Sequence, residues 1–148
     1  MDFIQNILHL EILLTYICNM NKKDHINFWL RSGNESWDAA VLLLQGHKNV
    51  EALFMFCLAI GKYLKASWVN DNIDDIPPRI HDLQSIYSQT DLELEPDLVD
   101  FLDTINRWNI EGRYPDFKFS LYKLATNEYT EKQYNKLTNL KTCLLEGL

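Results

Sequence analysis

The sequence predicts an all-α protein, an up-and-down antiparallel bundle of four to five main helices with an extra apolar helix at the N-terminus. Apolar residues recur every three or four positions over long segments, which is the spacing of amphipathic helices. No segment shows the sustained polar–apolar alternation of a half-buried strand. The 148 residues include only five Gly and four Pro, so few positions would interrupt a helix. Short connections between long helices favour antiparallel neighbours.

Residues 1–19 are predicted to form the separate apolar helix. The segment contains Asp2 and Glu11, and it lacks a basic start and a small-residue cleavage site, so it is a poor signal peptide. It is also short for a bilayer span, and we expect no membrane partner. Two interpretations stay open: a helix packed on the bundle or on a partner, or an extension outside the main domain. We assign the bundle domain to residues 20–148.

Two further helices follow in the expected bundle. Residues 24–45 have an apolar face and a polar face, and Gly46 provides a stop. After the Pro77-Pro78 pair, which ends the preceding helix, residues 79–89 carry enough apolar positions for a short helix.

The helix expected between them, residues 49–69, is apolar nearly all round. Its one charged face holds Lys62 and Lys65, but Met55 and Leu58 interrupt that face at helical spacing. Such a helix is either central in the bundle or buries its last face against a second subunit.

End signals also locate the last two long helices. Pro96 stands where a first helical residue is tolerated, and that helix is expected to end around Gly112. Thr130, with Gln133 three residues later, forms a capping-box pattern that predicts the start of the final helix.

The charge balance limits the range of partners. Fourteen Lys and Arg stand against 21 Asp and Glu, a net charge of −7 that repels long phosphate backbones. We therefore expect no extended nucleic-acid partner, while a local basic pocket for a small anion stays open. Cys18, Cys57 and Cys143 lie in apolar runs without metal-ligand spacing, as small core residues do in a reducing compartment such as the cytoplasm.

A search for catalytic constellations finds none. The four histidines lack a partner at i+4 for a helical metal pair, and there is no Gly-rich phosphate loop or nucleophile elbow. We assign no catalytic residue, no metal and no cofactor from these patterns.

A series of local runs, in order and spacing, resembles the HEPN family, a group of helical nucleotide-binding and toxin–antitoxin-associated domains. The runs are residues 25–32 with their continuation to residue 44, residues 52–66, residues 78–83, residues 102–106 and residues 111–116.

Two departures from the family pattern bear on function. Gly61 stands where many relatives carry an acidic residue before the first lysine of the second helix. HEPN ribonucleases use an Arg followed four to six residues later by a His, which together stabilise phosphate charge and move the 2′-hydroxyl proton. None of the four arginines has a histidine in that window. The resemblance therefore implies the non-ribonuclease type.

The resemblance places a set of candidate ligand-binding side chains around one end of the bundle: Lys62, Lys65, Arg79, His81, Arg113, Tyr114 and Asp116. Arg113 could hold a phosphate as a fork, and Tyr114 could stack on a base. The alternatives are an Arg113–Asp116 pair, a Lys65 side chain that lies along apolar surface, and a His81–Asp82 helix start.

The resemblance implies a non-catalytic module, dimeric, that binds a nucleotide or similar anion, works beside a nucleotidyltransferase partner, or does both. Two alternatives are a ribonuclease toxin of a toxin–antitoxin pair and a purely structural dimer. The sequence leaves the ligand, the partner and the pathway open.

Overall fold

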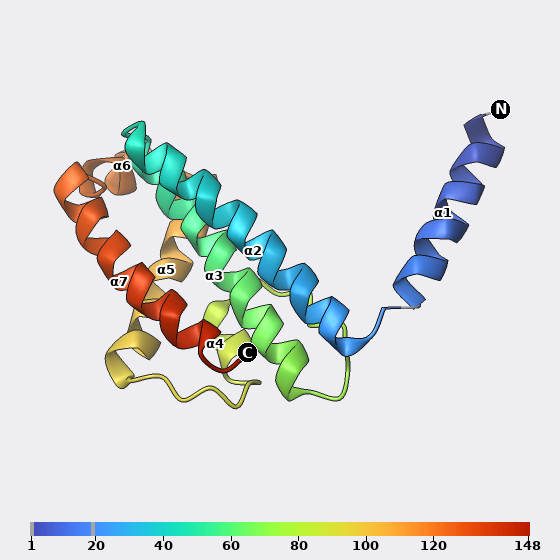
Figure 1. Cartoon of the computed structure of the whole chain (residues 1–148). Coiled ribbons are helices and arrows are strands. Elements are labelled where there is room, and N and C mark those ends of the chain that lie inside the picture. The colour runs from blue at the N-terminus through green and yellow to red at the C-terminus, as the bar shows by residue number, and fades with distance from the viewer. Residues whose placement is uncertain (1, 19) are drawn as a thin grey trace.

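The computed structural model describes residues 2–18 and 20–148, which form seven helices and no strand. The helices are α1 (Asp2–Cys18), α2 (Lys22–Gln45), α3 (Asn49–Asp71), α4 (Leu83–Tyr87), α5 (Pro96–Arg113), α6 (Ser120–Leu124) and α7 (Asn127–Leu145). Long helices α2, α3, α5 and α7 lie side by side as a bundle, so the predicted all-helical bundle is confirmed (Figure 1).

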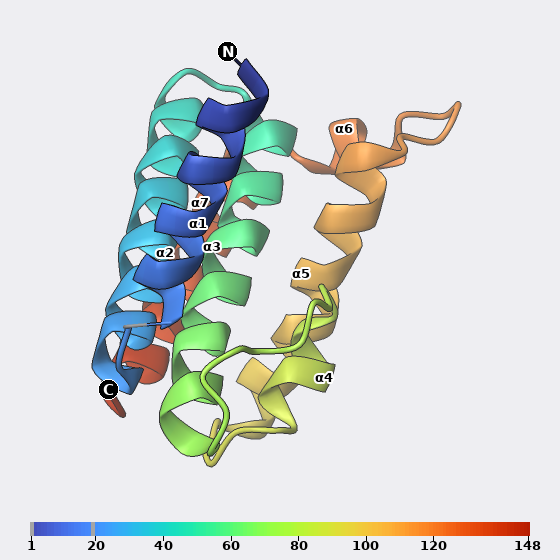
Figure 2. The same cartoon turned by 90° about the vertical axis from the view of Figure 1, so that its right-hand side faces the viewer.

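Helix α3 is the centre of the bundle. It packs against α2, α4, α5, α6 and α7, as Figures 1 and 2 show for the long helices. Leu53, Phe56 and Ile60 on α3 are fully buried. The central position predicted from the all-round apolar pattern is therefore confirmed. α3 is also the one helix in the described residues long and apolar enough to cross a membrane, but 67% of its apolar window is buried in the bundle, which is typical of a core helix.

The helix starts follow capping chemistry. Asn21 caps α2 through a capping box, in which its side chain accepts a bond from Asp24 N and the Asp24 carboxylate accepts one from Asn21 N. For α7, the prediction that Thr130 is the cap is wrong. Thr126 accepts the bond from Tyr129 N, while Thr130 is buried one turn later and donates its hydroxyl to Thr126 O at 2.8 Å.

The short helices differ most from expectation. α4 covers only Leu83–Tyr87 of the predicted 79–89, because Asp82 caps it by accepting a bond from Ser85 N at 2.7 Å. α6 was not predicted at all; five residues are too few to show an apolar period. α5 ends at Arg113, one residue beyond the predicted Gly112.

The N-terminal segment is helical from Asp2 to Cys18, while Met1 and Asn19 of the predicted segment lie outside the described residues. α1 stands clear of the bundle in Figure 1. It exposes between 42% and 67% of each of its described large apolar side chains, which are Ile4, Ile7, Leu8, Leu10, Ile12, Leu13 and Leu14. This helix therefore does not pack on its own bundle.

Candidate functional site

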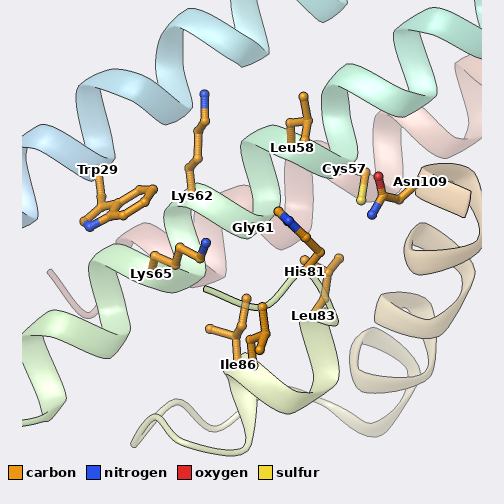
Figure 3. A pocket seen from close by; sticks show the side chains of 11 residues that line it. Trp29, Cys57, Leu58, Gly61, Lys62, Lys65, His81, Leu83, Ile86 and Asn109 are labelled. Carbon is orange, nitrogen blue, oxygen red and sulfur yellow. The ribbon is translucent and has the colours of Figure 1, made fainter. Parts of the chain in front are cut away.

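A small groove opens between α2, α3, the segment that leads into α4, and α5 (Figure 3). Its volume is about 100 Å³. The lining residues are Trp29, Cys57, Leu58, Gly61, Lys62, Lys65, Ile80, His81, Leu83, Ile86 and Asn109. These side chains give the groove an apolar floor and four polar groups, which are two ammonium groups, one imidazole and one amide.

Lys62 is anchored to α2. Its Nζ donates to Ser36 Oγ at 2.7 Å and to Ser32 O at 3.3 Å, and Figure 3 shows the amine directed toward α2. Partial burial lowers the pKa of Lys62 below its ordinary value, because desolvation disfavours the charged form. Its two protein contacts leave one of the three ammonium protons for a ligand.

Lys65 lies one turn further along α3, and its Nζ lies 5.1 Å from the centroid of the Trp29 ring. The predicted contact with apolar surface thus takes the form of a cation–π interaction. Burial lowers the pKa of Lys65, and the charge of Lys62 lowers it further. Among the described residues, neither lysine has a carboxylate within 4 Å. The groove therefore holds two like charges without a neutralising partner.

His81, just before the start of α4, contributes an imidazole to the rim of the groove. His81 is exposed at the rim, one residue before the cap Asp82. Asp82 also accepts a bond from the Asn106 amide at 2.9 Å, and Asn106 accepts one from Leu83 N at 2.9 Å. These bonds attach the start of α4, next to His81, to α5 beside the groove.

Arg113 does not line the groove. Its Nε donates to Asn109 Oδ1 at 3.1 Å, and its guanidinium lies 5.4 Å from the centroid of the Phe54 ring. It is close enough to Cys57 that its charge partly opposes the effect of burial, which raises the pKa of that thiol to about 12. The side chain that Arg113 contacts is Asn109 rather than Asp116, whose carboxylate binds Ser120 instead.

The seven candidate residues therefore do not form one site. Lys62, Lys65 and His81 share the groove, while Arg79 is exposed and outside its lining. Tyr114 and Asp116 line a second cavity beside α6.

Of the eleven lining residues, Lys62, Lys65 and His81 were among the candidates, and the side chains that sequence reasoning missed include Trp29 and Asn109. Trp29 lies three residues before Ser32, on the same side of α2 as the Lys62 contact, and that spacing is the signal that could have found it. Asn109 had a similar signal, because it lies four residues before Arg113 on the same helix, and it lines the groove and binds Arg113.

The chemistry available in the groove favours binding over catalysis. The lining contains no carboxylate, and His81 is its one imidazole. Gly61 belongs to the lining, at the position where an acidic residue would neutralise a lysine. A Cβ at Gly61 would lie 3.4 Å from Leu83 Cδ2. Within the described residues, no group of three or more His, Cys, Asp or Glu side chains could hold a metal ion.

Comparison with known proteins gives one clear result. The family model described as "HEPN domain" matches residues 26–146, which cover helices α2 to α7 almost completely. No curated protein and no solved structure matches the chain. Because the family model extends over most of the chain and agrees with the helical bundle, the protein belongs to the HEPN family.

Proposed function

We propose that the chain is a non-catalytic HEPN module that binds a phosphate group, of a nucleotide or a similar anion, in the groove between α2, α3 and α5. The observation that carries the proposal is the pair of partly buried lysines, Lys62 and Lys65, with no carboxylate in the lining. A bound anion would offset the repulsion between the two ammonium groups and stabilise their charged forms.

The size of the groove limits what it holds. Sites for drug-sized ligands have volumes of roughly 300–1,000 Å³, and this groove has about 100 Å³. We therefore expect it to enclose one phosphate group, with the remainder of a nucleotide at the open rim near His81. The net charge of −7 does not prevent this, because salt screens distant charges over about 10 Å.

Calorimetric titration with ATP tests the binding. Lys65→Gln should weaken ATP binding by about tenfold to a hundredfold, since loss of a charge-assisted contact costs roughly 1.5–3 kcal/mol. Lys132→Gln on the exposed side of α7 changes the net charge equally and should leave the affinity unchanged. Equal affinities for the wild type and Lys65→Gln would contradict the proposal.

Absence of ribonuclease chemistry is a separate part of the proposal. It is supported by the missing Arg–His spacing and by the separation of Arg113 from the groove that His81 borders. Purified protein incubated with structured and unstructured RNA should leave both intact. Cleavage that is lost in His81→Ala or Arg113→Ala would favour the toxin alternative.

The module is further proposed to act as a dimer, with α1 in contact with a second copy. The support is the set of apolar side chains on α1 that no part of its own bundle covers. Exposed apolar surface of this extent is typical of protein interfaces. Sedimentation at high micromolar concentration should show a dimer, and Leu10→Gln with Leu14→Gln should shift it to monomer. A monomeric wild type would contradict this part.

Family membership supports one more proposal, a nucleotidyltransferase partner. If the neighbouring gene encodes a minimal nucleotidyltransferase, co-expression of the two proteins should yield a complex that survives gel filtration. Separate elution of the two proteins would count against it.

A further inference from the structure

A second cavity, at the C-terminal end of α5, shares no lining residue with the lysine groove, and its chemistry is different. It is formed by the end of α5, the loop that projects from the bundle in Figure 2, and α6. Its volume is about 310 Å³. The lining residues are Glu111, Tyr114, Pro115, Asp116, Phe119, Ser120, Leu121 and Tyr122.

Three aromatic rings form the walls of this cavity. Tyr114 is 77% exposed and Phe119 54% exposed, so both side chains are accessible to a ligand. The ring of Phe119 meets that of Tyr122 edge to face, with centroids 5.5 Å apart. The hydroxyl of Tyr122 donates to Glu51 Oε1 at 3.2 Å, which ties the ring to α3. Tyr122 is therefore held from outside the cavity, and Phe119 packs against it.

Two carboxylates complete the lining. Asp116 accepts a bond from Ser120 N at 2.8 Å and one from Ser120 Oγ at 2.6 Å. These bonds lower the pKa of Asp116 and keep it ionised at neutral pH, while its remaining lone pairs stay available. Glu111, the second carboxylate, is half-buried on the last turn of α5.

No basic side chain belongs to the lining of this cavity, among residues that are all described by the structure. Arg113 is occupied elsewhere, on Asn109 and the Phe54 ring. Lys118 and Lys123 are exposed on the surrounding loop and helix, outside the lining. The cavity is thus aromatic and anionic, whereas the groove of Lys62 and Lys65 is cationic.

We propose that this second cavity binds an organic cation, of the methylated ammonium type, between Tyr114, Phe119 and the two carboxylates. The negative faces of aromatic rings attract such cations, and three rings beside fixed negative charge are the arrangement that recognises quaternary ammonium groups. A volume of about 310 Å³ is at the lower limit of small-molecule sites and suits a trimethylammonium head group with its first methylene groups. Phosphate-bearing ligands are disfavoured there by Glu111 and Asp116.

The probe for this proposal is N-acetyl-trimethyllysine amide, with a neutral analogue that carries a tert-butyl group in place of the trimethylammonium. Amide chemical shifts of the isotope-labelled full chain are followed by NMR during titration. The cation should shift resonances of residues 111–122 and bind about tenfold more tightly than the neutral analogue, a difference of about 1.4 kcal/mol that charge and cation–π attraction together supply. Absence of shifts up to about 10 mM cation, an affinity far weaker than any useful site, would overturn the proposal.

Two variants localise the effect, and a third is their control. Tyr114→Leu and Glu111→Gln should each weaken binding of the cation by about fivefold, while Glu128→Gln, an exposed carboxylate on α7, should not change it. Equal binding of the neutral analogue would overturn the cation site in favour of plain apolar contact. Stronger shifts of the same residues by AMP would overturn it in favour of base stacking. The site is independent of the lysine groove, so its failure leaves the ATP titration unaffected.

Discussion

Helices α1 and α3 are both rich in apolar residues, yet they have opposite environments. Ile60 of α3 is fully buried, whereas Ile12 of α1 is 66% exposed. α3 has 23 residues and is surrounded by five other helices, while α1 has 17 and projects from the bundle. Apolar composition therefore does not by itself predict whether a helix is buried in its own bundle, because two apolar helices of one chain differ in this respect.

Chain connectivity explains the difference. α3 is followed by α4 and α5, and the chain then returns along it as α7, so its neighbours in sequence are also its neighbours in space. α1 is joined to α2 through the short connection between Cys18 and Lys22. The apolar surface of α3 is covered by neighbouring helices, whereas the described apolar side chains of α1 stay exposed.

The largest expected effect tests this comparison directly. Ile60→Ala should lower the free energy of unfolding by about 2–5 kcal/mol, because it leaves a cavity in the centre of the core. Ile12→Ala removes the same atoms from an exposed position and should change the unfolding free energy of the bundle by less than about 0.5 kcal/mol. Urea unfolding at low protein concentration measures both. Similar losses in the two variants would show that α1 packs on its own bundle.

A smaller effect sharpens the description of the α2–α3 contact. A Cβ at Gly33 would lie 2.6 Å from Cε1 of Tyr63, whose hydroxyl donates to Asn34 Oδ1 at 2.7 Å. Gly33→Ala should therefore destabilise the fold by about 1–2 kcal/mol, since overpacking exceeds the gain in helix propensity.

The matched control is Gly61→Ala on α3. Its Cβ would meet only Leu83 Cδ2, at an ordinary 3.4 Å, and the variant should be more stable by about 0.5–1 kcal/mol. Thermal unfolding followed by circular dichroism gives the sign in each case. If Gly61→Ala destabilises the fold as much as Gly33→Ala, then α3 tolerates no added methyl group at its contact with α2 or at its contact with α4.

The smallest effect is a pH dependence that arises in the α3 core. Burial raises the pKa of Cys57 to about 12, above the ordinary thiol value. The folded state keeps this proton where the unfolded chain loses it, so the stabilisation is complete below the unfolded pKa and is lost as pH rises toward 12. Between pH 8 and pH 10 the loss should be about 1 kcal/mol.

Urea unfolding of the wild type and Cys57→Ala at both pH values isolates this contribution, because other groups such as Lys62 and Tyr63 titrate in both proteins. The pH-dependent loss should be smaller in Cys57→Ala. Identical losses would show that the thiol reaches solvent in the folded protein. The difference between the two proteins in this pH-dependent loss should not depend on α1.

The long helices could be predicted because each repeats its apolar period over several turns. The bounds of α2 and α3 agree with expectation to within two residues, and α5 begins at the predicted Pro96. The start of α7 could not be predicted, because Thr126 and Thr130 both have cap chemistry. Burial of Thr130 in the core, which the sequence does not reveal, decides between them.

The candidate site was harder to predict because helix ends redirect consecutive side chains. Lys62 and Lys65 are three residues apart on one helix, so their shared face follows from the helical repeat. Arg113 and Tyr114 are adjacent, but α5 ends between them. Arg113 points back to Asn109, while Tyr114 and Asp116 follow the loop into the second cavity. A resemblance that treats residues 111–116 as one unit cannot show that division.

One contact has a practical consequence for experiments in solution. Lys141 of α7 holds its ammonium 4.4 Å from the ring centroid of Trp37 and 5.4 Å from that of Tyr63. A positive charge at that distance perturbs the excited state of an indole, so the fluorescence of Trp37 reports whether α7 is docked. Trp29 has a comparable contact, with Lys65 Nζ 5.1 Å from its ring centroid. In variants that keep Trp29 or Trp37 as the single tryptophan, the emission should therefore change when the neighbouring ammonium group moves.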